Sequence, residues 1–125
     1  MRVLLDTQVF VWATIDSPRL SAEGRALLRD ASEVYVSAAS IWEIAIKARL
    51  GRISAGPARM VEAIEDSGFL ELSVTARHAA SVERLPLHHN DPFDRLLVAQ
   101  AIAEPLRLVS ADPIVARYTD LVIRL

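Results

Sequence analysis

The chain has 125 residues, which is enough for one domain with its own hydrophobic core. Hydrophobic residues make up 52% of it and charged residues 24%, a balance that is typical of a folded domain and excludes a disordered one. Cysteine is absent and the net charge is −2, which excludes disulfides and thiolate metal sites and argues against a protein that coats nucleic acid through a basic excess.

The apolar start of the chain resembles a signal peptide only superficially. Asp6 interrupts it early and no small-residue cleavage site follows, so we predict no signal peptide. No segment approaches the roughly 20 uncharged apolar residues that a membrane span needs. These features, with the lack of cysteine, fit a cytoplasmic protein that does not contact a membrane.

Short β-branched runs alternate with longer amphipathic patterns along the chain. Strands are predicted at 2–5, 33–37, 69–73, 106–110 and 121–124. Helices are predicted at 7–14, 21–31, 40–50, 57–66 and 75–84, then from Asp91 to about Ala101, with a short helix after Asp112. This alternation predicts one α/β domain over residues 1–125, a three-layer α/β/α fold around a mostly parallel sheet of four to five strands.

Four acidic residues fall near one predicted edge of that sheet. Asp6 ends the first strand, in LLDT, and Asp112 follows the fourth, in LVSAD. Asp94 lies in the first turn of the helix before the fourth strand, and Glu43 in the first turn of the helix predicted at 40–50. Ligands of open parallel sheets bind outside the carboxyl ends of the strands, so we expect these acids to share a site.

Each acid also has a structural explanation when it is taken alone. Asp6 and Asp112 have the chemistry of helix N-caps. Asp91, followed by Pro92, has a cap-then-proline signature, and we interpret it mainly as a cap. Asp94 would favour the dipole of the same helix. These explanations must all hold independently, whereas one metal site accounts for the set.

Gathered carboxylates raise one another's pKa unless a cation compensates them. Oxygen ligands without cysteine or a convergent set of histidines suit Mg²⁺ or Mn²⁺. Such a metal activates a water and neutralises charge on a phosphoryl group, as in two-metal nucleases. The hydroxyls of Thr7 and Ser110, beside the acids, and the side chain of Asp91 are candidates to orient the ligands.

At these residues the chain resembles a known family. LLDT, SIWEIAIKARLGR, HNDPFDRLLVAQA and LVSAD are similar to the PIN domain and specifically to VapC-type toxin ribonucleases of type II toxin–antitoxin (VapBC) systems. The resemblance spans essentially the full length and keeps the order of the acidic motifs. It implies that Asp6, Glu43, Asp94 and Asp112 bind Mg²⁺ or Mn²⁺ as an acidic quartet.

The resemblance also implies an activity and partners. Family members are endoribonucleases, usually of tRNA or rRNA, that leave a 3′-hydroxyl and a 5′-phosphate. Their usual partner is a VapB-type antitoxin whose tail can block the site, and they commonly form homodimers. Apolar residues on the first two helices and on 41–50 exceed what one small core absorbs, which supports a dimer face and an antitoxin groove.

Several other polar residues lie near the acidic motifs. His88 and His89 are tempting general bases, but a polar loop pair ahead of the cap is the favoured interpretation, since a metal-activated water needs no histidine. Arg95 has two open roles, contact with an RNA phosphate or with a neighbouring carboxylate.

Basic and aromatic residues around the predicted 40–50 helix leave alternatives open. Lys47, Arg49 and Arg52 form either a solvated helix face, which is favoured, or contacts to the RNA backbone. Trp12 and Trp42 sit among apolar neighbours, so packing in the core or at a subunit interface is favoured over stacking on RNA bases.

Other protein classes fit the chain less well. A phosphoryl-accepting receiver domain needs an Asp after a middle strand, but none follows EVYVS, and the one lysine lies within a predicted helix. A haloacid-dehalogenase-type phosphatase needs Asp-x-Asp at the first strand, where Gln8 stands instead. The remaining alternative is a catalytically silent PIN-fold binding or regulatory module, which an intact quartet argues against because buried carboxylates are costly without a metal.

Overall fold

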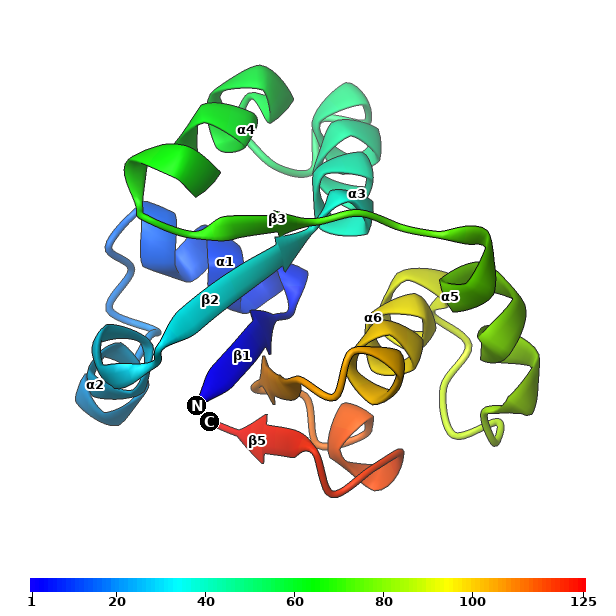
Figure 1. The fold of residues 1–125 in the computed structure, drawn as a ribbon. Helices are drawn as coiled ribbons and strands as arrows, with labels where there is room; N and C mark the ends of the chain where they lie inside the picture. Colours follow the sequence, from blue (N-terminus) through cyan, green and yellow to red (C-terminus); the bar gives the residue numbers. More distant parts are fainter.

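All five predicted strands are present and pair in one sheet. The computed structural model describes residues 1–125. The strands are β1 (Arg2–Leu5), β2 (Glu33–Ser37), β3 (Leu70–Leu72), β4 (Arg107–Ser110) and β5 (Val122–Arg124). Their order is β3-β2-β1-β4-β5 and every pairing is parallel, so the sheet is entirely rather than mostly parallel (Figure 1).

Helices cover both faces of this sheet. They are α1 (Thr7–Thr14), α2 (Ala22–Asp30), α3 (Ala38–Arg49), α4 (Pro57–Asp66), α5 (Ala76–Ser81) and α6 (Pro92–Ala103), with 3-10 helices η1 (Val82–Arg84) and η2 (Val115–Arg117). Figure 1 shows α1, α3 and α4 on one side of the sheet and α5 and α6 on the other. The predicted three-layer α/β/α fold is therefore confirmed.

The period of two along β1 divides the core between the two faces. Val3 and Leu5 are fully buried in a cluster with residues of α1, α3 and α4. Leu4, between them in sequence, is fully buried in the other cluster, with Leu97 and Val98 of α6. Both faces are thus sealed by helices, which is why the strands read as continuous apolar runs.

The boundaries of two helices differ from those predicted. α3 begins at Ala38, directly after β2, because Ser37 ends the strand and also caps the helix by accepting a hydrogen bond from the Ala39 N–H at 3.0 Å. Glu43 therefore lies in the second turn of α3, not the first. The helix predicted at 75–84 is split into α5 and η1, with Thr75 as the expected cap, accepting from the His78 N–H.

The order in which strands are added to the sheet reverses at β1. Strands β2 and β3 lie on one side of it, and β4 and β5 lie on the other. Leu5 pairs with Val36 and with Val109, so the residues that follow these three strand positions emerge at one edge. Such a switch point is where open α/β sheets bind ligands. No helix in the structure combines the length and the apolar character that a bilayer crossing requires.

Candidate metal-dependent active site

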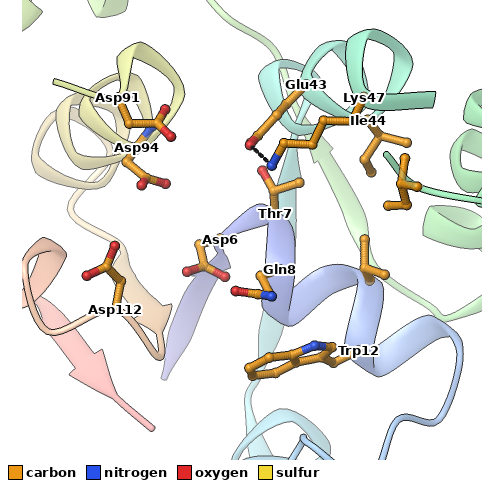
Figure 2. Close-up of a pocket in the computed structure, with 12 residues that line it drawn as sticks. Asp6, Thr7, Gln8, Trp12, Glu43, Ile44, Lys47, Asp91, Asp94 and Asp112 are labelled. Atoms are coloured by element: carbon orange, nitrogen blue, oxygen red, sulfur yellow. Dashed lines mark hydrogen bonds and ion pairs between the residues drawn. The ribbon is translucent and has the colours of Figure 1, made fainter. Parts of the chain in front are cut away.

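A cavity of about 280 Å³ opens at this switch point, beyond the carboxyl ends of β1 and β4 (Figure 2). Its acidic lining residues are Asp6, Glu43, Asp91, Asp94 and Asp112. Figure 2 shows the carboxylates of Asp6, Asp94 and Asp112 facing a common space, while Glu43 approaches from α3. The structure thus brings together all four acids of the predicted quartet.

Asp6 is both a helix cap and a lining residue of the cavity. Its Oδ1 accepts a hydrogen bond from the Val9 N–H at 2.8 Å, which starts α1. Burial raises the pKa of Asp6; hydrogen bonds from the Ser110 hydroxyl and the Val9 N–H oppose the rise, and the nearby charges of Glu43 and Asp112 add to it. The two interpretations of Asp6 therefore do not exclude each other.

In α6 the two tasks fall to different residues: Asp91 caps the helix, and Asp94 provides a carboxylate to the cavity. Asp91 caps α6, because its Oδ1 accepts from the N–H groups of Phe93 at 2.8 Å and Asp94 at 3.2 Å. The helix then directs Asp94 into the cavity. Burial, followed by the charges of Asp91, Asp6 and Glu43, raises the pKa of Asp94 to about 7, and His89 partly opposes this.

Glu43 is almost fully buried and only half paired. Its Oε2 forms an ion pair with Lys47 Nζ at 2.7 Å, one turn further along α3. Its Oε1 has no hydrogen-bond partner, although a buried carboxylate oxygen normally has one. Lys47 is 46% exposed, as a solvated helix face predicts, but it also lines the cavity through this ion pair.

Asp112 lies in a turn before η2 and is about one-third exposed. Its Oδ1 accepts from the Ile114 N–H at 2.8 Å, and its own N–H donates to Ser110 Oγ at 3.1 Å. The Ser110 hydroxyl thus contacts the backbone of Asp112 and the carboxylate of Asp6, and its role in orienting metal ligands stays a prediction. Thr7 differs, since its hydroxyl donates to Ser40 Oγ at 2.9 Å rather than to a carboxylate.

His89 lies in the polar loop ahead of the α6 cap, as predicted, but its side chain also reaches two acids of the site. Its Nε2 lies 3.2 Å from Asp94 Oδ2 and 3.4 Å from Asp112 Oδ2. A ligand atom from each of these three side chains falls within 4.8 Å of the other two. His88 points elsewhere, packing edge-on against Tyr118 with ring centroids 5.0 Å apart. The only signal in the sequence was position, two residues before the cap of α6.

Arg95 stabilises the segment before α6. Its guanidinium donates to the carbonyl oxygens of Pro86 at 2.8 Å and Val82 at 3.2 Å, and to the Tyr118 hydroxyl at 3.2 Å. It pairs with no carboxylate, so that alternative is wrong. With these donors engaged, nothing in its geometry favours contact with an RNA phosphate.

Arg49 and Arg52 are exposed near the end of α3. Arg52 lines a second cavity beside α3 and the start of α6, together with Lys47 and Phe93. Contact between these arginines and RNA stays a prediction.

The two tryptophans have different surroundings. Trp12 is half-buried, packs against the core and lines the acidic cavity. Trp42 is 61% exposed and packs edge-on against Phe93, with ring centroids 5.1 Å apart. Core packing is therefore wrong for Trp42, whereas an interface role stays a prediction.

The chemistry of this donor set fits a hard divalent cation. All four quartet residues offer oxygen, the ligand type that Mg²⁺ and Mn²⁺ prefer. Burial, with the charges of neighbouring acids, raises the pKa of Asp6 and of Asp94, and Oε1 of Glu43 has no partner, so a cation in this cavity would compensate its carboxylates. Asp6, Glu43, Asp94 and Asp112 are thus the residues that would hold the metal.

Comparison with known proteins agrees with this site. Residues 3–121 match the PIN domain family. The chain is 34% identical over 117 residues to Ribonuclease VapC22 of Mycobacterium tuberculosis, an alignment that covers 88% of this chain and 86% of that protein. The chain therefore belongs to the PIN-domain family and, within it, to the VapC-type proteins, which confirms the resemblance seen in the sequence.

Solved structures share the fold at low sequence identity. One is the crystal structure of VapBC2 from Rickettsia felis bound to a DNA fragment from their promoter, with a TM-score of 0.70, 17% identity and coverage of 100% of this chain and 98% of that one. Another is a toxin–antitoxin complex from Klebsiella pneumoniae, with a TM-score of 0.67, 14% identity and coverage of 97% and 95%. At these identities the likeness supports the fold.

Proposed function

We propose that this chain is an Mg²⁺- or Mn²⁺-dependent endoribonuclease toxin that cleaves tRNA or rRNA. The observation that carries this proposal is the convergence of Asp6, Glu43, Asp94 and Asp112 on one cavity, from four separate segments of the chain. The similarity to Ribonuclease VapC22 supports the same class of reaction. Metal dependence follows from the oxygen-only donor set and its deficit of positive charge.

The residues of the site have distinct roles in this mechanism. When bound, a divalent cation would lower the pKa of the attacking water and neutralise charge on the phosphodiester. Backbone N–H groups fix Asp6 and Asp112, so their free oxygens keep a constant direction. Burial and neighbouring acids raise the pKa of Asp94 to about 7, so this carboxyl is partly protonated near neutral pH, and a cation bound there would favour its ionised form. Lys47 neutralises one oxygen of Glu43 and leaves the other free.

We also propose two protein partners. A VapB-type antitoxin would inhibit the enzyme by covering the acidic cavity, which is reachable because Asp112 is about one-third exposed. A second copy of the chain would cover the apolar side chains that α3 leaves exposed, Trp42, Ile46 and Leu50. A cytoplasmic location is part of the same proposal.

The first experiment incubates purified, antitoxin-free protein with total RNA and Mg²⁺ or Mn²⁺. Controls are EDTA, the Asp6→Asn variant, and Asp30→Asn, which neutralises a surface aspartate at the end of α2 that is 75% exposed. Cleavage is expected from the wild type and Asp30→Asn with metal only. Mapping the fragment ends would then identify the RNA and test for a 5′-phosphate.

Two results would contradict the proposal. Cleavage that persists in EDTA or in Asp6→Asn would remove the metal site from the mechanism. Absence of cleavage on both tRNA and rRNA, by folded protein shown to bind Mn²⁺, would favour the catalytically silent binding module instead.

A further inference from the structure

We propose that His89 is a positioning residue of the acidic site, which keeps the carboxylates of Asp94 and Asp112 converged and directed toward the metal. This inference rests on the proposed function, since it assigns His89 a task in the same site. The two ring nitrogens of His89 have different contacts, Nδ1 with the backbone of Asp91 and Nε2 with the two carboxylates.

His89 links two carboxylates that the fold alone does not link. Asp94 belongs to the first turn of α6, whereas Asp112 lies in the turn after β4. The Nε2 atom of His89 lies 3.2 Å from Oδ2 of the first and 3.4 Å from Oδ2 of the second. No lysine or arginine pairs with either carboxylate, so His89 is their one basic neighbour within ion-pair distance.

The opposite side of the ring fixes which nitrogen carries the hydrogen. The backbone N–H of Asp91 donates to Nδ1 of His89 at 2.9 Å. A ring nitrogen that accepts a hydrogen bond has no proton, so the neutral ring carries its hydrogen on Nε2. The nitrogen that carries the hydrogen is therefore the one that lies next to the two Oδ2 atoms. Asp91 thus sets both the start of α6, through its side chain, and the orientation of His89, through its backbone.

The backbone of His89 is also held in place. The Tyr118 hydroxyl donates to the His89 carbonyl oxygen at 3.2 Å, and Arg95 donates to that hydroxyl at 3.2 Å. The imidazole is largely buried, with 19% of its side-chain surface exposed. Arg95 therefore has a structural role that its position in the sequence did not reveal. It stabilises the segment that carries His89.

A count of lone pairs shows that His89 orients these ligands without blocking them. A carboxylate oxygen has two lone pairs. A contact with Nε2–H takes up at most one lone pair of each Oδ2 and leaves at least one for a cation, while Asp112 Oδ1 already accepts from the Ile114 N–H. Because Nε2 carries a hydrogen, it is not itself a metal ligand. His89 therefore acts through Asp94 and Asp112, in the way that groups behind metal ligands set ligand direction.

The test separates the Nε2–H group from the rest of the side chain. In His89→Asn, the amide oxygen can replace Nδ1 as acceptor for the Asp91 N–H, but no donor reaches the two aspartates. In His89→Gln, an amide N–H is available at about the position of Nε2. His88→Asn is the matched control, since His88 packs on Tyr118 and away from the acids.

Binding of Mn²⁺ to the full chain is measured by electron paramagnetic resonance of the free ion, with circular dichroism as the check of folding. The Kd is expected to rise roughly 10- to 100-fold in His89→Asn, the range found when a group behind a metal ligand is removed. It should recover at least in part in His89→Gln and stay unchanged in His88→Asn. Nitrogen-15 NMR of the wild type in EDTA should show the Nε2–H tautomer.

Other outcomes overturn the inference and distinguish it from the proposed function. An unchanged Kd in folded His89→Asn shows that His89 does not position the ligands, while metal-dependent cleavage stands. Tighter binding in that variant means that His89 competes with the metal. An Nδ1–H tautomer contradicts the assigned geometry. A wild type that binds no Mn²⁺ overturns both proposals.

Discussion

The pKa of Asp94 shows how strongly the surroundings of one residue change its ionisation. Burial removes its carboxyl from water, and the charges of three nearby acids add to this effect, so its pKa rises from 3.8 to about 7. Between these two values the folded chain binds more protons at this group than the unfolded chain does. The contribution of Asp94 to the free energy of unfolding therefore falls as the pH rises from about 4 to about 7, and it is lost above the folded pKa.

Asp94→Asn removes this titration and tests it directly. In EDTA the variant should be more stable than the wild type at pH 8 by up to about 4 kcal/mol, with the difference vanishing near pH 4. Urea unfolding at several pH values measures this, and the same variant should lose RNA cleavage. Parallel pH profiles for the two proteins would show that Asp94 titrates normally. A stabilised but inactive variant is the pattern expected of a residue kept for function.

Lys47 compensates the negative charge of the buried Glu43 carboxylate. Replacing it with Met leaves the buried carboxylate of Glu43 without its cationic partner. We expect Lys47→Met to lose about 1 to 2 kcal/mol of stability in EDTA, less than for a fully buried pair because Lys47 is 46% exposed. Saturating Mg²⁺ should narrow the gap, since the cation supplies the missing charge. Arg59→Met, which breaks only surface pairs with Glu62 and Asp66, is the control and should cost less than about 1 kcal/mol in either condition.

At the scale of elements, local chemistry at strand and helix ends decides where the site residues point. The strands and the apolar helix faces followed from periods of two and 3.6 in the sequence, and Asp91 with Pro92 marked the start of α6. The start of α3 was less predictable, because Ser37 serves two elements with no loop between them. A helix boundary is set by such caps, and the position of Glu43 on α3 follows from it.

The cap of α6 gives a prediction that separates helix formation from charge. Asp91→Ala removes the acceptor for the Phe93 and Asp94 N–H groups and should cost about 1 kcal/mol of stability. Asp91→Asn keeps an effective cap and removes one of the charges that raise the pKa of Asp94, so its stability in EDTA at pH 8 should equal or exceed that of the wild type. Equal losses in both variants would mean that the charge of Asp91, and not its capping, stabilises the structure.

Considered as a whole molecule, the fold and the acidic quartet were predictable from the sequence, whereas the contacts of side chains were not. Asp6 and Asp112 follow strand ends directly, so the rule for parallel sheets places them together, whereas Glu43 and Asp94 reach the same edge from the helices that follow β2 and precede β4. His89 reaches Asp112 only because two segments 23 residues apart meet in space. Trp42 is exposed despite its apolar neighbours, because a sequence pattern shows that a face is apolar without showing whether this chain or another covers it.

That uncovered face leads to a prediction about assembly. Trp42, Ile46 and Leu50 are spaced four residues apart on α3 and its C-cap, so they lie along one side of the helix, and they are 61%, 38% and 60% exposed. If this stripe is the homodimer contact, Ile46→Glu places a charge at its centre and should convert dimers to monomers in light scattering after size exclusion. Mn²⁺ affinity should remain, because Ile46 is not a lining residue of the acidic cavity.

Ile102→Glu is the matched control for this experiment. Ile102 is a similarly exposed isoleucine on α6, at 46%, in a separate cavity beside α5. It should leave the mass in solution unchanged. A dimer that survives Ile46→Glu but not Ile102→Glu would move the interface to the α5–α6 side of the sheet. The exposed stripe on α3 would then be left as the surface for the antitoxin, because a patch of this kind is costly to leave in water.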